Sequence, residues 1–260
     1  MDKQYYRLMI PRSSPALSPV TDGLTLWIDG RDGIYDTSFQ SVAQGLELNT
    51  FYVYDRTSET YRLYQISPYG YLYGRYNGSG IIEYVKRNNL IQIGGLEMMG
   101  NMPNVRTIEV TIALDKSVMS TATNRCMLLN DGTNYKGWAA SSNGVFSPST
   151  SINGGGGAPP YHHGVATTPL VDTAMHHYLV TIGDDLTRYL YKDGLLVSTS
   201  ESTVPVFNST TVISTFMTAR DVPIGSVMAR LASIRMYTDV LTADEIAQNY
   251  AYEQSTGRVL

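Results

Sequence analysis

Short runs in which apolar and polar residues alternate recur along most of the chain. In "GLTLWIDG", Leu24, Leu26 and Ile28 fall on one side of an extended backbone, and Trp27 falls on the other. The longer run "RTIEVTIALD", residues 106–115, alternates in the same way. A period of two is typical of a β-strand that turns one face toward a core. The pattern therefore predicts a chain built mainly from short strands.

Near the C-terminus, the stretch "RLASIRMYTDVLTADEIAQNY" changes from a strand pattern to a helix pattern. Its alternating first half predicts a strand with one buried side. Thr242 then stands three residues before Glu245, which is the spacing of a capping box, and Leu241 and Ile246 flank the cap as a hydrophobic staple. These signals predict a helix over roughly residues 243–253.

Turn residues separate the predicted strands and set two hairpins. Asp193-Gly194 lies between alternating runs, which is the strongest short hairpin signal, and residues 130–133 join "NRCMLLNDG" to "YKGWAAS". Residues 141–175 form a long polar loop, and loops of that length are commonly functional or disordered. About a dozen closely spaced strands with one convincing helix predict an all-β sandwich or jelly roll.

The first 22 residues differ in character from the rest of the chain. Prolines at positions 11, 15 and 19, with serines between them, favour an extended arm without ladder hydrogen bonds. We expect residues 23–260 to form one sandwich domain and the arm to serve assembly, although it could instead fold back over its own sheet. The expected docking element of the arm is an apolar cluster of Tyr5, Tyr6, Leu8, Met9 and Ile10.

Composition and charge narrow the classes of function. Hydrophobic residues make up 43% of the 260 positions, which is ample for a core, and the formal net charge is −4. Such a chain has no basic field for nucleic acid. The single cysteine, Cys126, allows no intramolecular disulfide, and we interpret it as a small buried hydrophobe. We expect no secretory signal and no membrane-spanning segment, because no apolar run has the required form or length.

The order of these pieces resembles the concanavalin A-like lectin/glucanase superfamily, in particular its laminin-G-like and pentraxin-like modules. "GLTLWIDGRDG" is similar to their first strand, "HHYLVTIGDDLTRYLYKDGLLVSTS" to their hairpin, and "GSVMARLASIRMYTDVLTADEIAQNY" to their last core strand and helix. The resemblance covers about residues 23–254 and is poor between 40 and 100. It implies a jelly-roll β-sandwich whose C-terminal helix packs at the edge of the sandwich, near where the chain begins. The same fold hosts enzymes, lectins and passive modules.

Glycosidases of that superfamily carry two carboxylates on alternate residues of one strand, which places both on one face. Here Glu109 is the only carboxylate in an eligible strand, and its neighbours on the same face are Thr107 and Thr111. We interpret it as an exposed polar residue. The histidine pairs at 162–163 and 176–177 are adjacent, so their side chains point opposite ways in an extended chain and neither pair chelates one metal. We therefore expect no catalytic residues and a protein that is not an enzyme.

Two places in the sequence offer binding side chains. Trp138, flanked by Tyr135 and a flexible loop, is the best candidate for a sugar-stacking platform, with a core position as the alternative. In the long loop, His162 and His163 lie beside Tyr161, where a binding role competes with an ordinary exposed loop. Tyrosine is abundant, with 20 Tyr against 5 Phe and 2 Trp, and suits half-exposed sheet faces or a stacking surface.

Calcium is the usual cofactor of the similar modules and needs several hard oxygens that converge from loops. Asp29 and Asp32 in "DGRDG", and Asn130, Asp131 and Asn134 in "NDGTN", supply such oxygens. The same residue types are expected in turns, which is the favoured interpretation. No metal and no other cofactor is therefore predicted.

Two functional hypotheses remain. In the first, the chain is a structural or decoration protein of a bacteriophage virion, made in the bacterial cytoplasm without a signal peptide. It contacts other virion proteins or copies of itself, with host glycans as a further partner. In the alternative, it is a carbohydrate-binding module for host adsorption or bacterial glycan handling. Neither hypothesis involves nucleic acid or membrane insertion.

Overall fold

The structure is a computed structural model of the 260-residue chain. It describes residues 17–48, 50–66, 72–76, 81–86, 96–98, 105–114, 125–127, 137–141, 146–149, 174–185, 187–200, 218–219 and 229–259.

These residues contain sixteen strands, a short 3-10 turn and one α-helix. The first strands are β1 (Leu24–Asp29), β2 (Glu47–Leu48), β3 (Thr50–Asp55), β4 (Thr60–Ile66), β5 (Leu72–Tyr76), β6 (Ile82–Lys86), β7 (Leu96–Met98) and β8 (Thr107–Leu114). The later strands are β9 (Arg125–Met127), β10 (Gly137–Ser141), β11 (Phe146–Ser149), β12 (His176–Ile182), β13 (Arg188–Lys192), β14 (Leu195–Ser200), β15 (Thr218–Ala219) and β16 (Ala229–Tyr237). The turn η1 spans Gly30–Asp32, and the helix α1 spans Ala243–Ser255.

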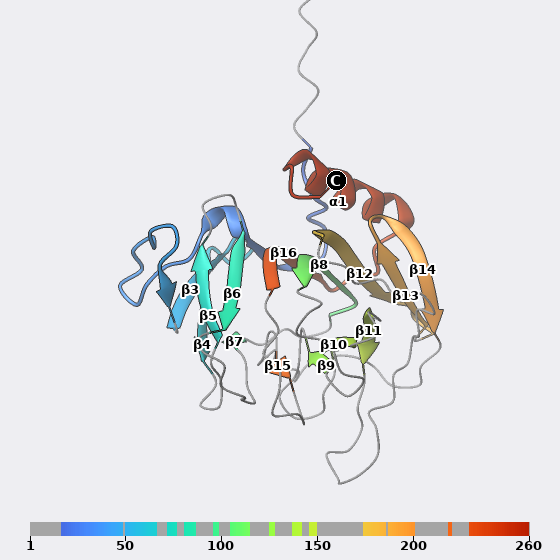
Figure 1. The fold of residues 1–260 in the computed structure, drawn as a ribbon. Coiled ribbons are helices and arrows are strands. Elements are labelled where there is room, and N and C mark those ends of the chain that lie inside the picture. Colours follow the sequence, from blue (N-terminus) through green and yellow to red (C-terminus); the bar gives the residue numbers. More distant parts are fainter. Residues whose placement is uncertain are drawn as a thin grey trace, which may run out of the picture.

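The strands form two antiparallel sheets (Figure 1). The large sheet has 12 strands, nine of them in the order β14-β13-β12-β8-β16-β1-β3-β4-β7. The other three form a branch, in which β6 pairs with β16, β5 pairs with β6, and β2 pairs with β5. The small sheet has the order β11-β10-β9-β15. Figure 1 shows the large sheet arching over the small one, with α1 on the opposite side. This arrangement confirms the all-β sandwich with one C-terminal helix that the sequence predicts.

β16 is the point where the large sheet branches. Its residues 229–231 pair with β6, and its residues 233–237 pair with β1. A β-bulge between Leu231 and Ser233 places Leu231 opposite Ile112 and Ser233 opposite Thr111, so these two residues face different sides. The predicted alternation through this strand is therefore broken at the bulge.

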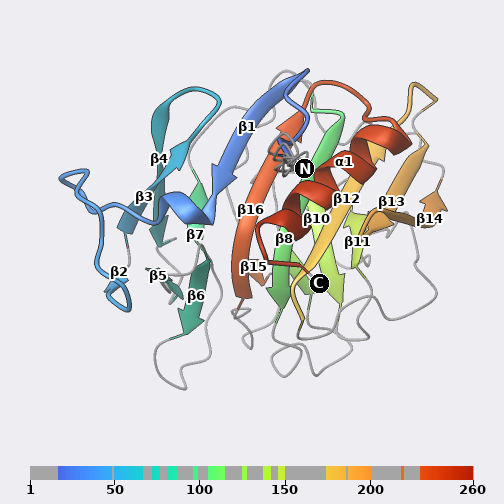
Figure 2. The same ribbon diagram turned by 90° about the horizontal axis from the view of Figure 1, so that it is seen from above.

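The central strands β8, β12 and β16 are buried on both faces. Toward the small sheet they present apolar side chains, which are Ile108, Val110, Ile112, Ile234 and Met236. Residues 231–237 are all buried, so the prediction of a strand with one buried side is wrong. The reason is that α1 crosses β16, β8 and β12 and covers the face that was predicted to be exposed to solvent (Figure 2).

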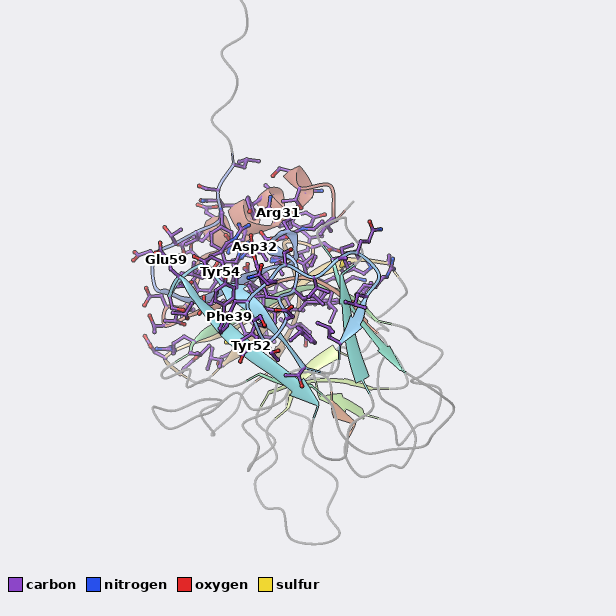
Figure 3. All side chains as sticks on the ribbon, turned by 90° about the vertical axis from the view of Figure 1, so that its left-hand side faces the viewer. Arg31, Asp32, Phe39, Tyr52, Tyr54 and Glu59 are labelled. Carbon is purple, nitrogen blue, oxygen red and sulfur yellow. The ribbon has the colours of Figure 1, made fainter. Side chains whose placement is uncertain are left out.

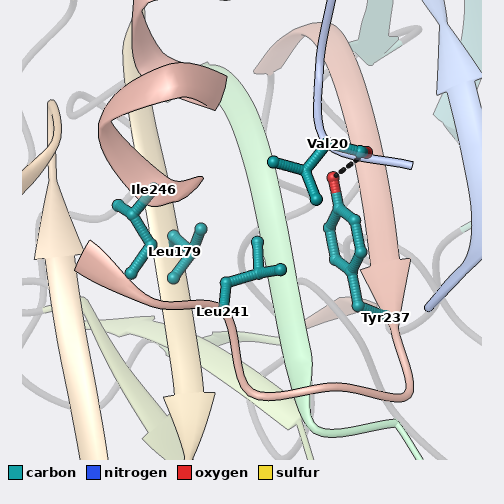
Figure 4. Close-up of a cluster of buried hydrophobic side chains, with 5 residues drawn as sticks. All are labelled: Val20, Leu179, Tyr237, Leu241 and Ile246. Atoms are coloured by element: carbon teal, nitrogen blue, oxygen red, sulfur yellow. Dashed lines mark hydrogen bonds between the residues drawn. The ribbon is translucent and has the colours of Figure 1, made fainter. Parts of the chain in front are cut away.

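The helix α1 begins at the predicted cap. The Glu245 backbone N–H donates to Thr242 Oγ1 over 3.4 Å, and the Thr242 N–H donates to Glu245 Oε2 over 2.8 Å, so both bonds of the capping box are present. The staple residues Leu241 and Ile246 are buried in one apolar cluster with Val20, Leu179 and Tyr237 (Figure 4). The capping box, the staple and the helix itself are confirmed.

Thr242→Ala is expected to lower the free energy of unfolding by about 1 kcal/mol, because one of the first backbone N–H groups of the helix loses its acceptor. The measurement is a urea titration of the variant beside the parent protein. Thr242→Ser retains the hydroxyl and is expected to keep most of the stability. Equal stability of the Ala variant and the parent would show that the cap is energetically silent.

Residues 17–22 lie against α1 and β16, although the sequence assigns them to the arm. The Val20 N–H donates to Asn249 Oδ1 over 2.7 Å, and the Val20 carbonyl accepts from the Tyr237 hydroxyl over 3.3 Å (Figure 4). Gln248 donates to the Ser18 carbonyl over 3.0 Å. The packed part of the chain therefore includes Val20, ahead of the predicted boundary, and its start meets α1 as the resemblance implies.

A layer of charged side chains fills the space between α1 and the large sheet. Arg235 donates through Nε to Glu109 and through Nη2 to Glu253 over 2.6 Å. Arg258 joins Glu253 to Asp29, with both distances 2.8 Å. Glu109 is only 1% exposed, so its interpretation as an exposed polar residue is wrong. The cause is again the cover of α1, and Arg235 supplies the positive charge that burial of Glu109 requires.

The histidines of β12 point to opposite sides of the sheet, as predicted. His177 is buried beside Glu109, with 3.5 Å between His177 Nε2 and Glu109 Oε2. His176 lies on the other side, and its Nδ1 is 2.7 Å from Asp193 Oδ2.

The hairpin between β13 and β14 has the tight turn that the sequence predicts. Asp193 and Gly194 both have positive φ, 51° and 75°, which is the geometry of a type I′ turn. β9 and β10 also pair, as predicted, while their connecting turn at 130–133 lies outside the described residues.

Candidate functional site

An exposed cluster of aromatic side chains lies on β3, β4 and the loop that precedes β3. It occupies the face of the large sheet that also carries α1. On β1, Trp27 points to that face together with its cross-strand neighbour Arg235. Because β3 pairs with β1, the outward side chains of β3 lie on the same face. We call this cluster the aromatic patch, and its members are Tyr35, Phe39, Tyr52, Tyr54 and Tyr61.

Strand alternation places the tyrosines of β3 on the outer face. Phe51 and Val53 are buried, while Tyr52 and Tyr54 between them are half-buried on the other side. Tyr54 stands directly opposite Tyr61 on β4, and such cross-strand neighbours are close enough to interact. Across the other edge of β3, Tyr35 exchanges two backbone hydrogen bonds of 2.8 Å with Tyr52. Three adjacent stretches of chain thus bring their tyrosines together.

Phe39 reaches the patch from a tight loop. The Asp36 carboxylate accepts from the backbone N–H groups of Ser38 and Gln40 over 2.8 and 2.9 Å, which fixes the loop. Phe39 itself has a φ of 57°, a conformation that bulky side chains rarely adopt. Residues held in such conformations cluster at functional sites. The loop therefore holds Phe39 at an energetic cost, in a place where the residue is 48% exposed.

The rings support one another. Their centroids are 4.7 Å apart for Phe39 and Tyr52, 4.9 Å for Phe39 and Tyr61, 4.9 Å for Tyr35 and Tyr61, and 5.5 Å for Tyr54 and Tyr61. These distances lie in the favourable range for edge-to-face and tilted aromatic pairs. Tyr61 contacts three of the other rings and is 40% exposed, so it is the centre of the patch.

Charged side chains border the patch on the side of α1. The Arg56 guanidinium lies 4.7 Å from the centroid of the Trp27 ring and donates to both oxygens of Asp32 over 2.7 and 2.8 Å. Figure 3 shows Arg31 and Asp32 nearest the helix, with Tyr54, Phe39 and Tyr52 following away from it. The patch therefore has apolar ring surface at its centre and polar groups at its border.

The hydroxyl group of Tyr35 stays protonated at physiological pH. Burial raises the pKa of Tyr35, and the neighbouring Tyr61 and Asp32 raise it further. A neutral phenol both donates and accepts a hydrogen bond. Apolar ring surface beside such hydroxyls is the combination that recognition of a sugar requires, since a sugar offers C–H faces and hydroxyl edges.

Of the residues that the sequence singled out for binding, the structure describes only the backbone of Trp138. Trp138 lies in β10 opposite Pro148, and its side chain is outside the description. Outside the described residues altogether are Tyr135, Tyr161, His162, His163, Tyr5, Tyr6, Leu8, Met9 and Ile10. The aromatic patch was not predicted, although the abundance of tyrosine and the alternation in "TFYVYD" were signals for it in the sequence.

The two aspartates considered for calcium are held by arginines. Asp29 accepts from Arg31 and Arg258, and Asp32 accepts from Arg56. Among the described residues, no three His, Cys, Asp or Glu side chains gather where they could hold a metal ion. Within the same ranges, no helix has the length and apolar character needed to cross a membrane.

Comparison with known proteins identifies the fold through solved structures. No protein-family model matches the chain, and no curated protein sequence matches it. The receptor-binding domain of botulinum neurotoxin type G is similar with a TM-score of 0.54 and 11% identity, over 89% of this chain and 52% of that one. Domain 4 of a GH43 extracellular arabinanase from Geobacillus stearothermophilus, solved with arabinotriose, has a TM-score of 0.53 and 12% identity, over 87% and 98% of the two chains.

A sialidase from Trypanosoma rangeli is also similar, with a TM-score of 0.51 and 14% identity over 91% of this chain, which spans only 33% of the sialidase. These neighbours correct the expectation that the chain is not an enzyme. That expectation rested on the missing carboxylate pair in one strand, and a fold found in a sialidase and in part of an arabinanase gives no support for it. What the similarities establish is the fold, a lectin/glucanase-like β-sandwich with one C-terminal helix.

Proposed function

We propose that this chain recognises carbohydrate and that the aromatic patch is its binding surface. The observation that carries the proposal is Phe39, which is held at a positive φ with its ring on Tyr52 and Tyr61 and yet is an exposed residue. A strained, exposed ring has no explanation in the packing of the core, because core packing would bury it. Stacking against the C–H face of a sugar would use both its exposure and its fixed position.

Tyr61→Ala is expected to weaken sugar binding about tenfold, because a stacked ring contributes on the order of 1 kcal/mol beyond the surface it buries. The measurement is a glycan array, followed by calorimetric titration with the best oligosaccharide. Arabinan oligosaccharides belong among the first probes, since the arabinanase domain with this fold was solved with arabinotriose.

The matched control is Tyr189→Ala, which removes a half-buried tyrosine from β13, on the other wing of the large sheet (Figure 1). It is expected to bind as the parent protein does. Phe39→Gly removes the ring and also relieves the positive φ, so it is expected to lose affinity without losing stability. A parent protein that binds no glycan, or a Tyr61→Ala variant that binds normally, would contradict the proposal.

A bacteriophage setting, with the chain as a decoration or structural protein of the virion, stays a proposal from the sequence. A glycan-binding surface suits a particle that must attach to a host cell. Mass spectrometry of purified particles tests it, and absence of the chain from such particles would contradict it.

A further inference from the structure

Acidic side chains outnumber basic ones in the segment that carries the aromatic patch. Residues 29–61 contain six acidic side chains, which are Asp29, Asp32, Asp36, Glu47, Asp55 and Glu59. The same stretch contains two basic side chains, Arg31 and Arg56. Its formal charge is therefore −4, which equals the formal charge of all 260 residues. The segment that carries the aromatic patch is therefore net acidic in sequence.

Both arginines of the stretch are already neutralised. Arg56 forms a two-pronged pair with Asp32, and its Nη1 lies 3.2 Å from Asp29 Oδ2. Arg31 donates to Asp29 through Nε over 3.0 Å and also contacts the Tyr252 hydroxyl. A guanidinium that pairs with a carboxylate in this way has little positive charge left for an anionic ligand.

Two further carboxylates lie in the same segment as the rings, and no cation among the described side chains contacts either of them. Asp36 accepts backbone N–H groups three residues before Phe39. Glu59 is exposed at the turn of the β3–β4 hairpin, two residues before Tyr61, and lies on the same side as Tyr54 in Figure 3. The negative charge of this region also acts on Tyr35. Burial raises the pKa of its hydroxyl, and nearby Asp32 raises that pKa further.

We propose that the aromatic patch takes uncharged glycans and discriminates against acidic ones. The inference rests on the proposed function and names the class of sugar. Ring surface binds neutral and acidic sugars alike through their C–H faces, so it does not distinguish them. The surrounding carboxylates do distinguish them, because a sialic, uronic or sulfated group would be placed against like charge with no unpaired cation among the described side chains of this stretch.

The experiment compares neutral oligosaccharides with their own sialylated or sulfated derivatives, first on an array and then by calorimetric titration of one pair. The acidic member is expected to bind roughly fivefold more weakly at 0.15 M salt. Lowering the salt is expected to widen the ratio, since screening decreases.

Glu59→Lys reverses one exposed charge of the border and is expected to bring the two affinities severalfold closer. Asp184→Lys is the matched control, because Asp184 is 97% exposed in the loop between β12 and β13, away from the patch. It is expected to leave the ratio unchanged.

The outcomes separate this inference from the proposed function. If the acidic derivative binds as tightly as the neutral sugar, and Tyr61→Ala abolishes both, the patch is a glycan site and the charge inference is wrong. If neither sugar binds, the proposed function itself fails. If Asp184→Lys changes the ratio as much as Glu59→Lys does, the effect belongs to net charge and the inference is again wrong.

Discussion

Arg235→Met is expected to lower the free energy of unfolding at neutral pH by roughly 3–5 kcal/mol, the largest effect of any single change considered for this chain. Arg235 is 0% exposed and lies between the carboxylates of Glu109 and Glu253. Methionine fills a similar volume, so the loss comes from the charge and not from a cavity. With stabilities of roughly 5–15 kcal/mol typical of a domain, about a fifth or more of the total is at stake.

The reason lies in what the substitution leaves behind. Glu253 retains Arg258, which donates to its other oxygen over 2.8 Å. Among the described side chains, Glu109 retains only Asn249, which donates to Oε2 over 2.8 Å, and the nearby His177. A buried carboxylate without a cation costs several kcal/mol, whereas an intact buried pair contributes little over an apolar replacement.

A second substitution tests this explanation. Adding Glu109→Gln to Arg235→Met removes the uncompensated charge, while the amide oxygen still accepts from Asn249, so the double variant is expected to be more stable than Arg235→Met alone. Urea titrations of the single and double variants measure the coupling. Arg106→Met is the control, because Arg106 is about one third exposed and pairs with the exposed Asp184. A single variant no weaker than this control, or additive losses in the double variant, would refute the explanation.

The sequence predicts those parts of the fold whose signals are local. The cap at Thr242, the staple of Leu241 and Ile246, and the Asp193-Gly194 turn each depend on residues within a few positions of one another, and all are found. The sandwich class follows as well, because many short alternating runs leave few other ways to bury their apolar faces.

The errors arise where distant segments meet. Glu109 and Arg235 are 126 positions apart, and nothing local shows that α1 brings Glu253 and Asn249 over them. One signal was present, since Ile246, Asn249 and Glu253 share one stripe of the helix and place polar groups toward the sheet. Likewise, the tyrosines of β3 were visible as an alternation, but Phe39 joins them through a loop whose shape depends on Asp36 and on pairing with β3.

Acid is expected to destabilise the fold steeply between about pH 4.5 and pH 2, through Glu109 and Asp29. Burial alone raises the pKa of Glu109, but the charge of Arg235 and the neighbouring His177 outweigh it and hold the pKa at about 2, against 4.5 for an ordinary glutamate. Asp29 follows the same logic, since burial raises its pKa while Arg31 and Arg258 lower it to about 2, against 3.8.

Both pKa values are lower in the folded state than in the unfolded state, which fixes the direction of the effect. The unfolded chain takes up the two protons first as the pH falls, so the stabilisation is complete above about pH 5 and is lost as the pH approaches 2. A difference of about two pH units corresponds to about 3 kcal/mol for each group. The stability curve is therefore expected to fall by several kcal/mol across this window.

Proton uptake on unfolding measures this effect directly. Near pH 3, each group is expected to contribute close to one proton, or about 1.4 kcal/mol per pH unit, to the slope of unfolding free energy against pH. Glu109→Gln starts from a lower stability at neutral pH, because Arg235 loses a charged partner, yet its slope is expected to be shallower by nearly one proton. Asp184→Asn, which removes a carboxylate that is 97% exposed, is expected to keep the steep slope. If Glu109→Gln and Asp184→Asn give the same slope as the parent protein, the buried carboxylate does not control the acid transition.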